Sequence, residues 1–257
     1  MTFDDFLEMG RLRSKSTKFK EKIERTIDIC AQQMIKNKNP YVALSAGKDS
    51  VAMAFIVNEG AIMAGKNFRL WTHLSDASFP GTKETAEAVA KRIKRELDLY
   101  ESPISAFDMI KNPQKTPFGK SGCFYSSIRQ YAKDKDLSFV GVRAYESKRR
   151  MRAARVHGQC FHSDSMGNVD VCYPLLWFRL DDVAAVLYMF DAPIHPIYKK
   201  MCIENNRNSF DEERFIRLNY VTSRDLLNKG TAVFLKLNYP DIYMKLQRVY
   251  PEIANYI

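Results

Sequence analysis

The chain has 257 residues, of which 46% are hydrophobic and 27% are charged, so it can bury a sizeable core and global disorder is excluded. It carries 40 lysines and arginines against 30 acidic residues, and the resulting net charge of +10 favours polyanionic partners. The charge alone does not identify a partner, because a solvated basic surface gives the same total.

The hydrophobic pattern predicts helices and strands in alternation along most of the chain. Residues 2–38 form a helical segment with a basic face, and the break before Pro40 leads into a short buried strand at 41–45. The following elements, in chain order, are a buried helix at 51–57, a strand at 68–74, a helix at 82–97, a strand at 100–104, a helix at 124–133, a strand at 137–141, a helix at 181–190 and a mainly helical region from Lys199 onward. This order is typical of an α/β fold in which helices flank a parallel sheet.

The cysteines and the apolar stretches indicate where such a chain works. None of the five cysteines lies in a C-x-x-C pair, so no metal site is predicted and the thiols are expected to be reduced. The longest apolar stretch, 51–57, is too short to cross a membrane, and residues 1–10 lack the apolar core of a signal peptide. We therefore expect a cytoplasmic protein without a membrane partner.

The clearest chemical motif lies between the first strand and the helix after it, and reads Ser45-Ala46-Gly47-Lys48-Asp49-Ser50. At such a turn, backbone N–H groups and the helix N-terminus can bind a phosphate. Gly47 permits close approach and Lys48 supplies a point charge. The hydroxyls of Ser45 and Ser50 can donate to phosphate oxygens, and Asp49 is suited to help hold a bridging Mg²⁺. The spacing is not that of a Walker A loop, and the plain alternative is a tight strand–helix turn whose charged residues face water.

A second set of polar residues follows the predicted strand at 137–141. Gly141 lies at the carboxyl end of that strand, where open α/β sheets bind ligands. Arg143 and Arg150 offer planar donors for phosphate or sulfate, Glu146 lies four residues before Arg150 and can orient it, and Ser147 can donate to an anion. The alternative is a basic surface helix, because the run continues through Lys148, Arg149, Arg152 and Arg155.

These motifs and their order resemble a known superfamily. The loop resembles the Ser-Gly-Gly-x-Asp-Ser signature of the PP-loop ATP pyrophosphatases, with Ala46 in place of the first glycine. The segment His73–Thr85, the Gly-x-Arg-x-x-Glu-Ser-x-x-Arg motif at Gly141–Arg150 and the segment Tyr173–Tyr198 resemble the phosphoadenosine phosphosulfate reductase family. The resemblance covers roughly residues 41–198 and implies a Rossmann-like fold of the adenine nucleotide alpha hydrolase type.

The resemblance also implies roles for single residues. It assigns catalysis to Lys48 and Asp49, nucleotide binding to Ser45, Ala46, Gly47, Ser50, Asp76 and Gly141, and binding of a substrate or anion to Arg143, Glu146, Ser147 and Arg150. It implies ATP with Mg²⁺ as the bound cofactor. Together with the helical pattern at both ends of the chain, it predicts an N-terminal helical segment at 1–39, a PP-loop nucleotide-binding domain at 40–198 and a helical C-terminal subdomain at 199–257.

The departures from the family pattern decide between reactions. Reductases of this family use a thiol near the C-terminus, whereas no cysteine follows Cys202 here, and the paired cysteines of cluster-containing relatives are missing as well. An intact loop favours ATP, cleaved between the α and β phosphates to adenylylate an acceptor in sulfur or nucleic-acid modification chemistry. One alternative is a sulfonucleotide reductase with Cys123 as its thiol, and another is a non-catalytic module that binds nucleotide or nucleic acid. The acceptor stays open, as do a nucleic-acid partner, a partner subunit and a homodimer.

Overall fold

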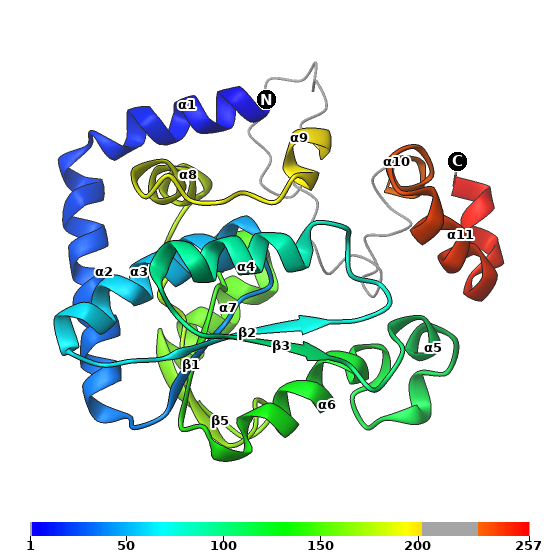
Figure 1. Cartoon of the computed structure of the whole chain (residues 1–257), viewed down its shortest axis with the longest axis horizontal. Helices are drawn as coiled ribbons and strands as arrows, with labels where there is room; N and C mark the ends of the chain where they lie inside the picture. The colour runs from blue at the N-terminus through cyan, green and yellow to red at the C-terminus, as the bar shows by residue number, and fades with distance from the viewer. Residues whose placement is uncertain (1, 202–230, 257) are drawn as a thin grey trace.

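A six-stranded sheet lies at the centre of the protein, as the computed structural model shows for the residues that it describes, 2–201 and 231–256 (Figure 1). The strand order is β3-β2-β1-β4-β6-β5, and every neighbouring pair is parallel except β5 with β6. The strands are β1 (Pro40–Ala43), β2 (Arg69–Leu74), β3 (Leu97–Glu101), β4 (Leu137–Val140), β5 (Cys160–Ser163) and β6 (Val169–Cys172). The predicted α/β fold with a mostly parallel sheet is confirmed.

Helices cover both faces of this sheet. Figure 1 shows α3, α4 and α8 on one side of the sheet and α6 on the other. The helices are α1 (Phe3–Ser14), α2 (Thr17–Lys36), α3 (Lys48–Ala64), α4 (Thr82–Ile93), α5 (Ala106–Lys111), α6 (Gly122–Tyr131), α7 (Lys148–His157), α8 (Leu180–Met189), α9 (Ile197–Met201), α10 (Thr231–Asn238) and α11 (Pro240–Val249). The stretch 202–230 of the predicted helical C-terminal subdomain lies outside the described residues.

Alternating side chains of the strands feed two separate cores. On β1, Val42 packs into the core formed with α2, α3 and α8, whereas Tyr41 packs against Trp71 and the α6 residue Ile128 on the opposite face. This alternation follows from the pleat of a strand, in which successive side chains point to opposite faces. A third core joins α10 and α11 to α5 and includes Phe79.

The N-terminal helices are fastened to α8 by one buried carboxylate. Asp182 is fully buried, and its oxygens accept hydrogen bonds from Nε of Arg13 at 2.8 Å and from Nζ of Lys22 at 2.6 Å. Asp182 also accepts the backbone N–H of Arg179 at 3.0 Å, so it forms part of a capping box at the start of α8. The helical segment predicted at 2–38 is divided, because Ser16 takes an extended conformation and α2 starts anew after it.

None of the helices in the described part of the chain is both long enough and apolar enough to cross a membrane.

Candidate nucleotide site

The strand order places the two predicted motifs side by side. From β1 the chain continues outward to β2 and β3, and then returns to form β4 on the other flank of β1. The loops that follow β1 and β4 therefore leave the same edge of the sheet at the point where the strand order reverses. Open α/β sheets bind their ligands at this point.

The loop after β1 is held in shape by its own serines. The hydroxyl of Ser50 donates to the carbonyl of Gly47 at 3.0 Å and accepts the backbone N–H of Ser45 at 3.1 Å. Ser50 is buried and secures the turn, whereas Ser45 is exposed and its hydroxyl lies 3.0 Å from that of Ser50. Helix α3 begins at Lys48, and its N-cap residue Gly47 has no side chain to cap it, so the N–H groups of its first turn point out of the helix end, that of Lys48 toward the hydroxyl of Tyr198.

Ala46 occupies a backbone conformation that favours glycine. Its φ is +59°, in the left-handed region, and its side chain is fully buried. A residue with a Cβ is strained there by roughly 1–2 kcal/mol. This strain gives a physical reason for the glycine that the family signature carries at this position.

Three charged residues meet behind the loop. Asp49 Oδ1 lies 2.6 Å from Nε of Arg143, and Asp49 Oδ2 forms an ion pair with Nζ of Lys48. Arg143 is 1% exposed and Lys48 is 8% exposed, so the group is largely removed from water. Burial raises the pKa of Asp49, but the charges of Lys48 and Arg143 outweigh it and bring that pKa down to about 2. The carboxylate is therefore ionised at neutral pH, and both its oxygens are engaged.

Gly141 brings the second loop against the first. A Cβ on Gly141 would lie 3.0 Å from the backbone N of Ser50 and 3.1 Å from the carbonyl carbon of Asp49. Because those atoms belong to the backbone of α3, they cannot move aside for a side chain. Gly141, predicted to bind nucleotide, is thus the position where the backbone after β4 contacts the start of α3.

The other residues of the second motif hold one another. Glu146 accepts the backbone N–H of Arg143 at 3.1 Å and forms an ion pair with Arg150. The predicted Glu146–Arg150 pair is therefore present, although Glu146 precedes α7 in a short 3₁₀ turn. Ser147 caps α7, because its hydroxyl accepts the backbone N–H of Arg150 at 3.2 Å.

Asp76 lies at a different place on the same edge of the sheet. Its two oxygens accept the backbone N–H of Ala106 at 2.8 Å and the hydroxyl of Ser105 at 2.5 Å. Asp76, predicted to bind nucleotide, therefore links the segment after β2 to the start of α5. Its side chain is exposed.

Cys123 has a histidine neighbour that sequence reasoning missed. Its Sγ lies 3.6 Å from Nε2 of His73 and 3.1 Å from the hydroxyl of Ser102. Burial raises the pKa of Cys123 and lowers the pKa of His73 to about 4, so both side chains are neutral at pH 7. The two residues are 50 positions apart, and no sequence spacing indicates their contact.

Tyr198 is a second residue that sequence reasoning left out of the site. Its hydroxyl accepts the backbone N–H of Lys48 at 3.0 Å, and burial raises the pKa of that hydroxyl. The one signal in the sequence was its place at the end of the last family-like segment. The described residues include no group of three or more His, Cys, Asp or Glu side chains that could hold a metal ion.

Comparison with known proteins gives one family match and several similar folds. Residues 39–222 match the phosphoadenosine phosphosulfate reductase domain. No curated protein sequence matches the chain significantly.

Among solved structures, the FMN adenylyltransferase of Candida glabrata, in complex with FMN and the ATP analogue AMPCPP, is similar with a TM-score of 0.56 at 14% identity, covering 93% of each chain. The U34-tRNA thiolase NcsA of Methanococcus maripaludis, which has a [4Fe-4S] cluster, has a TM-score of 0.54 at 16% identity, covering 94% of this chain and 82% of that chain. The NMN synthetase of Francisella tularensis has a TM-score of 0.52 at 12% identity, covering 94% of this chain and 96% of that chain.

At these identities the structural likeness concerns the fold alone. The matched segment, by contrast, carries both the loop after β1 and the Gly141–Arg150 motif in their family order. The protein belongs to the phosphoadenosine phosphosulfate reductase domain family, within the PP-loop adenine nucleotide alpha hydrolase superfamily.

Proposed function

We propose that the protein binds ATP at the loop 45–50, cleaves it between the α and β phosphates and transfers the adenylyl group to an acceptor, releasing pyrophosphate. The observation that carries the proposal is the complete loop at the start of α3, located where the strand order reverses and backed by Arg143. Helix N-termini at such points favour phosphate through their oriented N–H groups. We also propose that the protein works in the cytoplasm, where cysteines stay reduced and nucleotides are available.

In this mechanism the charges near the loop stabilise the departing pyrophosphate. Lys48 and Arg143 bring two positive charges and Asp49 one negative charge, so the trio keeps a net charge of +1 beside the loop. Preorganised donors of this kind act where charge develops in the transition state. Arg150, oriented by Glu146, would hold the α-phosphate or the acceptor.

Mg²⁺ does not fit Asp49 in this arrangement. Each carboxylate oxygen already accepts from a cation, Arg143 or Lys48, so a metal ion on Asp49 would share these oxygens with two adjacent positive charges that repel it. Mg²⁺ commonly keeps several waters and binds through substrate phosphates with few protein ligands. We therefore propose that Mg²⁺ enters bound to the phosphates of ATP, as part of the substrate.

The direct test is to identify the products. The protein is incubated with ATP labelled in the α-phosphate and candidate acceptors, and AMP or adenylylated acceptor together with pyrophosphate is the expected outcome. Formation of ADP and orthophosphate alone would contradict the proposal. Lys48→Ala should lower the rate by about 10²–10³, whereas Lys91→Ala, an exposed lysine on α4, should leave it unchanged.

Sulfonucleotide reduction is the second candidate, and the contact between Cys123 and His73 is the observation that favours it. The raised pKa of that thiol works against a nucleophilic role. Reductase activity that disappears in Cys123→Ala would support this candidate, and activity retained in that variant would eliminate Cys123 as its thiol. ATP binding without turnover, in which Lys48→Ala changes affinity alone, would instead indicate a non-catalytic module.

A further inference from the structure

We propose that a groove along α7 binds a single-stranded nucleic acid, and that this strand is the acceptor; the second part rests on the proposed function. The groove has a volume of about 420 Å³, and the residues that line it include Tyr145, Ser147, Lys148, Met151, Arg152 and Arg155. It directly follows the Arg143–Glu146 segment of the candidate site. A strand lying in it would therefore approach the nucleotide.

The charges of the groove all have one sign. Lys148, Arg152 and Arg155 are spaced i, i+4 and i+7, so they lie along one face of α7, and all three are exposed. No acidic residue lines the groove, and no ion pair to these three cations occurs within the described part of the chain. Arg150 differs from them, because Glu146 balances its charge.

The length of this cationic row favours a chain of phosphates over a single one. Seven residue steps separate Lys148 from Arg155, which corresponds to roughly 10 Å along a helix. A lone phosphate group is too small to reach cations at both ends, whereas successive phosphates of a strand can. The net charge of +10 over the whole chain adds long-range attraction for such a ligand.

Aromatic side chains beside the cations supply the second element of strand recognition. Tyr145 is 40% exposed, and the guanidinium carbon of Arg179 lies 5.1 Å from the centre of its ring. Trp177 is also 40% exposed, and the hydrogen bond from Ala144 N–H to the Leu176 carbonyl brings the two aromatic positions into adjacent segments. Exposed rings next to a basic groove are the arrangement on which unpaired bases stack.

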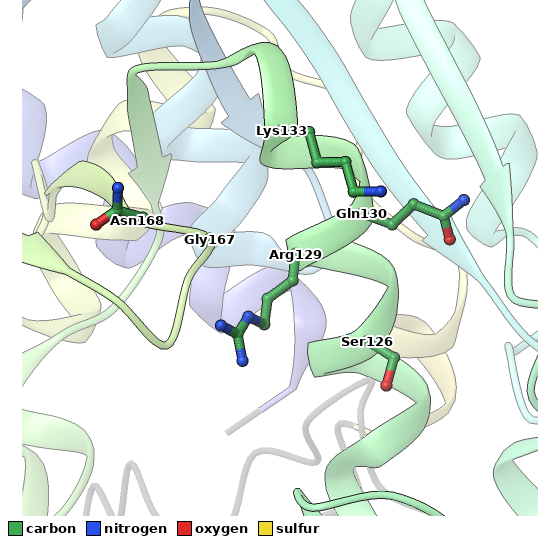
Figure 2. Close-up of a pocket in the computed structure, with 6 residues that line it drawn as sticks. All are labelled: Ser126, Arg129, Gln130, Lys133, Gly167 and Asn168. Atoms are coloured by element: carbon green, nitrogen blue, oxygen red, sulfur yellow. The ribbon is translucent and has the colours of Figure 1, made fainter.

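A second basic cavity provides a matched control. It has a volume of about 430 Å³ and includes Arg129 of α6, Lys133 of the short 3₁₀ turn after α6, and Gly167 and Asn168, which precede β6. It therefore lies at the amino edge of the sheet, away from the candidate site. In Figure 2 the side chains of Arg129 and Lys133 point in different directions, so they do not form one cationic row.

The test compares two double variants of the full chain that remove the same charges at the same spacing. Lys148→Gln/Arg152→Gln alters the groove, and Arg129→Gln/Lys133→Gln alters the control cavity. Binding of fluorescein-labelled 12-nucleotide oligo(U) and oligo(dT) is followed by anisotropy between 50 and 200 mM salt, without ATP. We expect the groove variant to lose at least about tenfold in affinity with a salt slope shallower by about two, and the control variant to stay within about twofold of wild type.

Several outcomes would overturn the proposal: no binding by the wild type, equal losses in both double variants, or full displacement of the strand by inorganic tripolyphosphate at equal phosphate concentration. Binding to phosphatidylserine vesicles but not to oligonucleotides, lost in the groove variant, would assign the groove to a lipid surface instead. Comparison of the RNA and DNA arms shows which strand is preferred. Thermal unfolding of both variants checks that the fold is kept.

Two further measurements separate the parts of the proposal. Tyr145→Ala should weaken strand binding and Tyr145→Phe should restore it, because stacking needs the ring and not the hydroxyl. Since the binding assay contains no ATP, its failure would leave the proposed reaction untouched. Failure of the ATP product assay with small-molecule acceptors would not contradict strand binding. If a labelled strand is incubated with ATP and acquires no adenylyl group, the strand is not the acceptor, although it can still bind in the groove.

Discussion

Asp49 and Arg143 are 94 residues apart in the chain, and in the fold Nε of Arg143 lies 2.6 Å from Oδ1 of Asp49. This ion pair joins the loop after β1 to the loop after β4. Two motifs that stand separately in the sequence thus form one structural unit. Arg143 holds Asp49 in place at the start of α3 and also brings its own positive charge to the loop.

Asp49→Asn should destabilise the protein strongly. The substitution removes the carboxylate that both Lys48 and Arg143 contact in a largely buried group, and breaking a buried ion pair in this way costs about 3–5 kcal/mol. Chemical denaturation of the variant should show this loss in the free energy of unfolding. Asp170→Asn is the control: it removes a half-exposed partner of His162 and should cost less than about 1 kcal/mol. Equal stability of Asp49→Asn and wild type would show that the trio does not hold the loop.

Substitutions at Ala46 should separate backbone strain from packing. Ala46→Gly removes the left-handed strain of roughly 1–2 kcal/mol, but it also loses one buried methyl group worth about 0.8 kcal/mol and adds freedom to the unfolded chain. We expect a change in unfolding free energy below about 1 kcal/mol. Ala46→Val keeps the strain and overfills a closed space, so it should destabilise by more than about 2 kcal/mol. A valine variant as stable as wild type would argue against this backbone conformation.

Stability should fall between pH 6.5 and pH 4 because the pKa values of two histidines, the buried His195 and the partly buried His73, are lowered in the folded state. Burial lowers the pKa of His195 to about 4, only partly opposed by the charge of Glu84, and burial lowers the pKa of His73 to about 4 as well. The ordinary histidine pKa is 6.5, so below that pH the unfolded state takes up protons that the folded state does not. Each histidine should contribute up to about 1.4 kcal/mol per pH unit in this window, and the contribution is complete above pH 6.5.

The hydrogen bonds of His195 supply the control. Its Nδ1 accepts the backbone N–H of Ile197 at 3.1 Å, which requires that nitrogen to be unprotonated. His195→Asn can place an oxygen near this position and has no group that titrates here. Unfolding measured from pH 7 to pH 4.5 should show a slope reduced by about half. An unchanged slope would assign the pH dependence to other groups.

Mild oxidation should join Cys160 to Cys172 and spare Cys123. The first two lie opposite each other in the β5–β6 register with their Sγ atoms 3.2 Å apart, and the hydrogen bond between the two thiols lowers the pKa of Cys160. Cys123 is 4% exposed and its pKa is raised by burial, so its reactive thiolate is scarce. Treatment with diamide followed by peptide mapping checks both statements. Cys172→Ser should abolish the cross-link, and a cross-link that persists would come from another pair.

The parts of the fold that the sequence predicts are those with a strong apolar pattern. The strands at 40–43 and 137–140 are mainly apolar and buried, and the strand at 69–74 has a buried centre at 70–72, so hydrophobic runs identify them. β5 and β6 were not predicted, because none of the residues of β5 is buried and Asp170 interrupts the apolar residues of β6, so neither strand forms a continuous apolar run. β3 begins at Leu97, three residues earlier than predicted, because the helix before it ends at Ile93.

The site shows a similar division. Motif order predicted which segments meet, since parallel strands deliver their carboxyl ends to one edge of the sheet. It did not predict that Arg143 and Asp49 would pair, because a guanidinium suited to a phosphate is equally suited to a carboxylate. The roles of Tyr198 and His73 depend on tertiary contacts over 150 and 50 residues, which no local pattern encodes.

The bond between the Tyr198 hydroxyl and the Lys48 backbone N–H has a thermodynamic consequence. A phosphate oxygen that takes up this N–H must displace the hydroxyl, so phosphate binding and the docked position of α9 compete for one donor. By reciprocity, any contact that fixes α9 against the loop lowers the affinity for nucleotide, and bound nucleotide weakens the docking of α9 by the same factor. Tyr198→Phe would remove the competing hydroxyl. The gain in nucleotide affinity of that variant would then measure the coupling between nucleotide binding and the docking of α9.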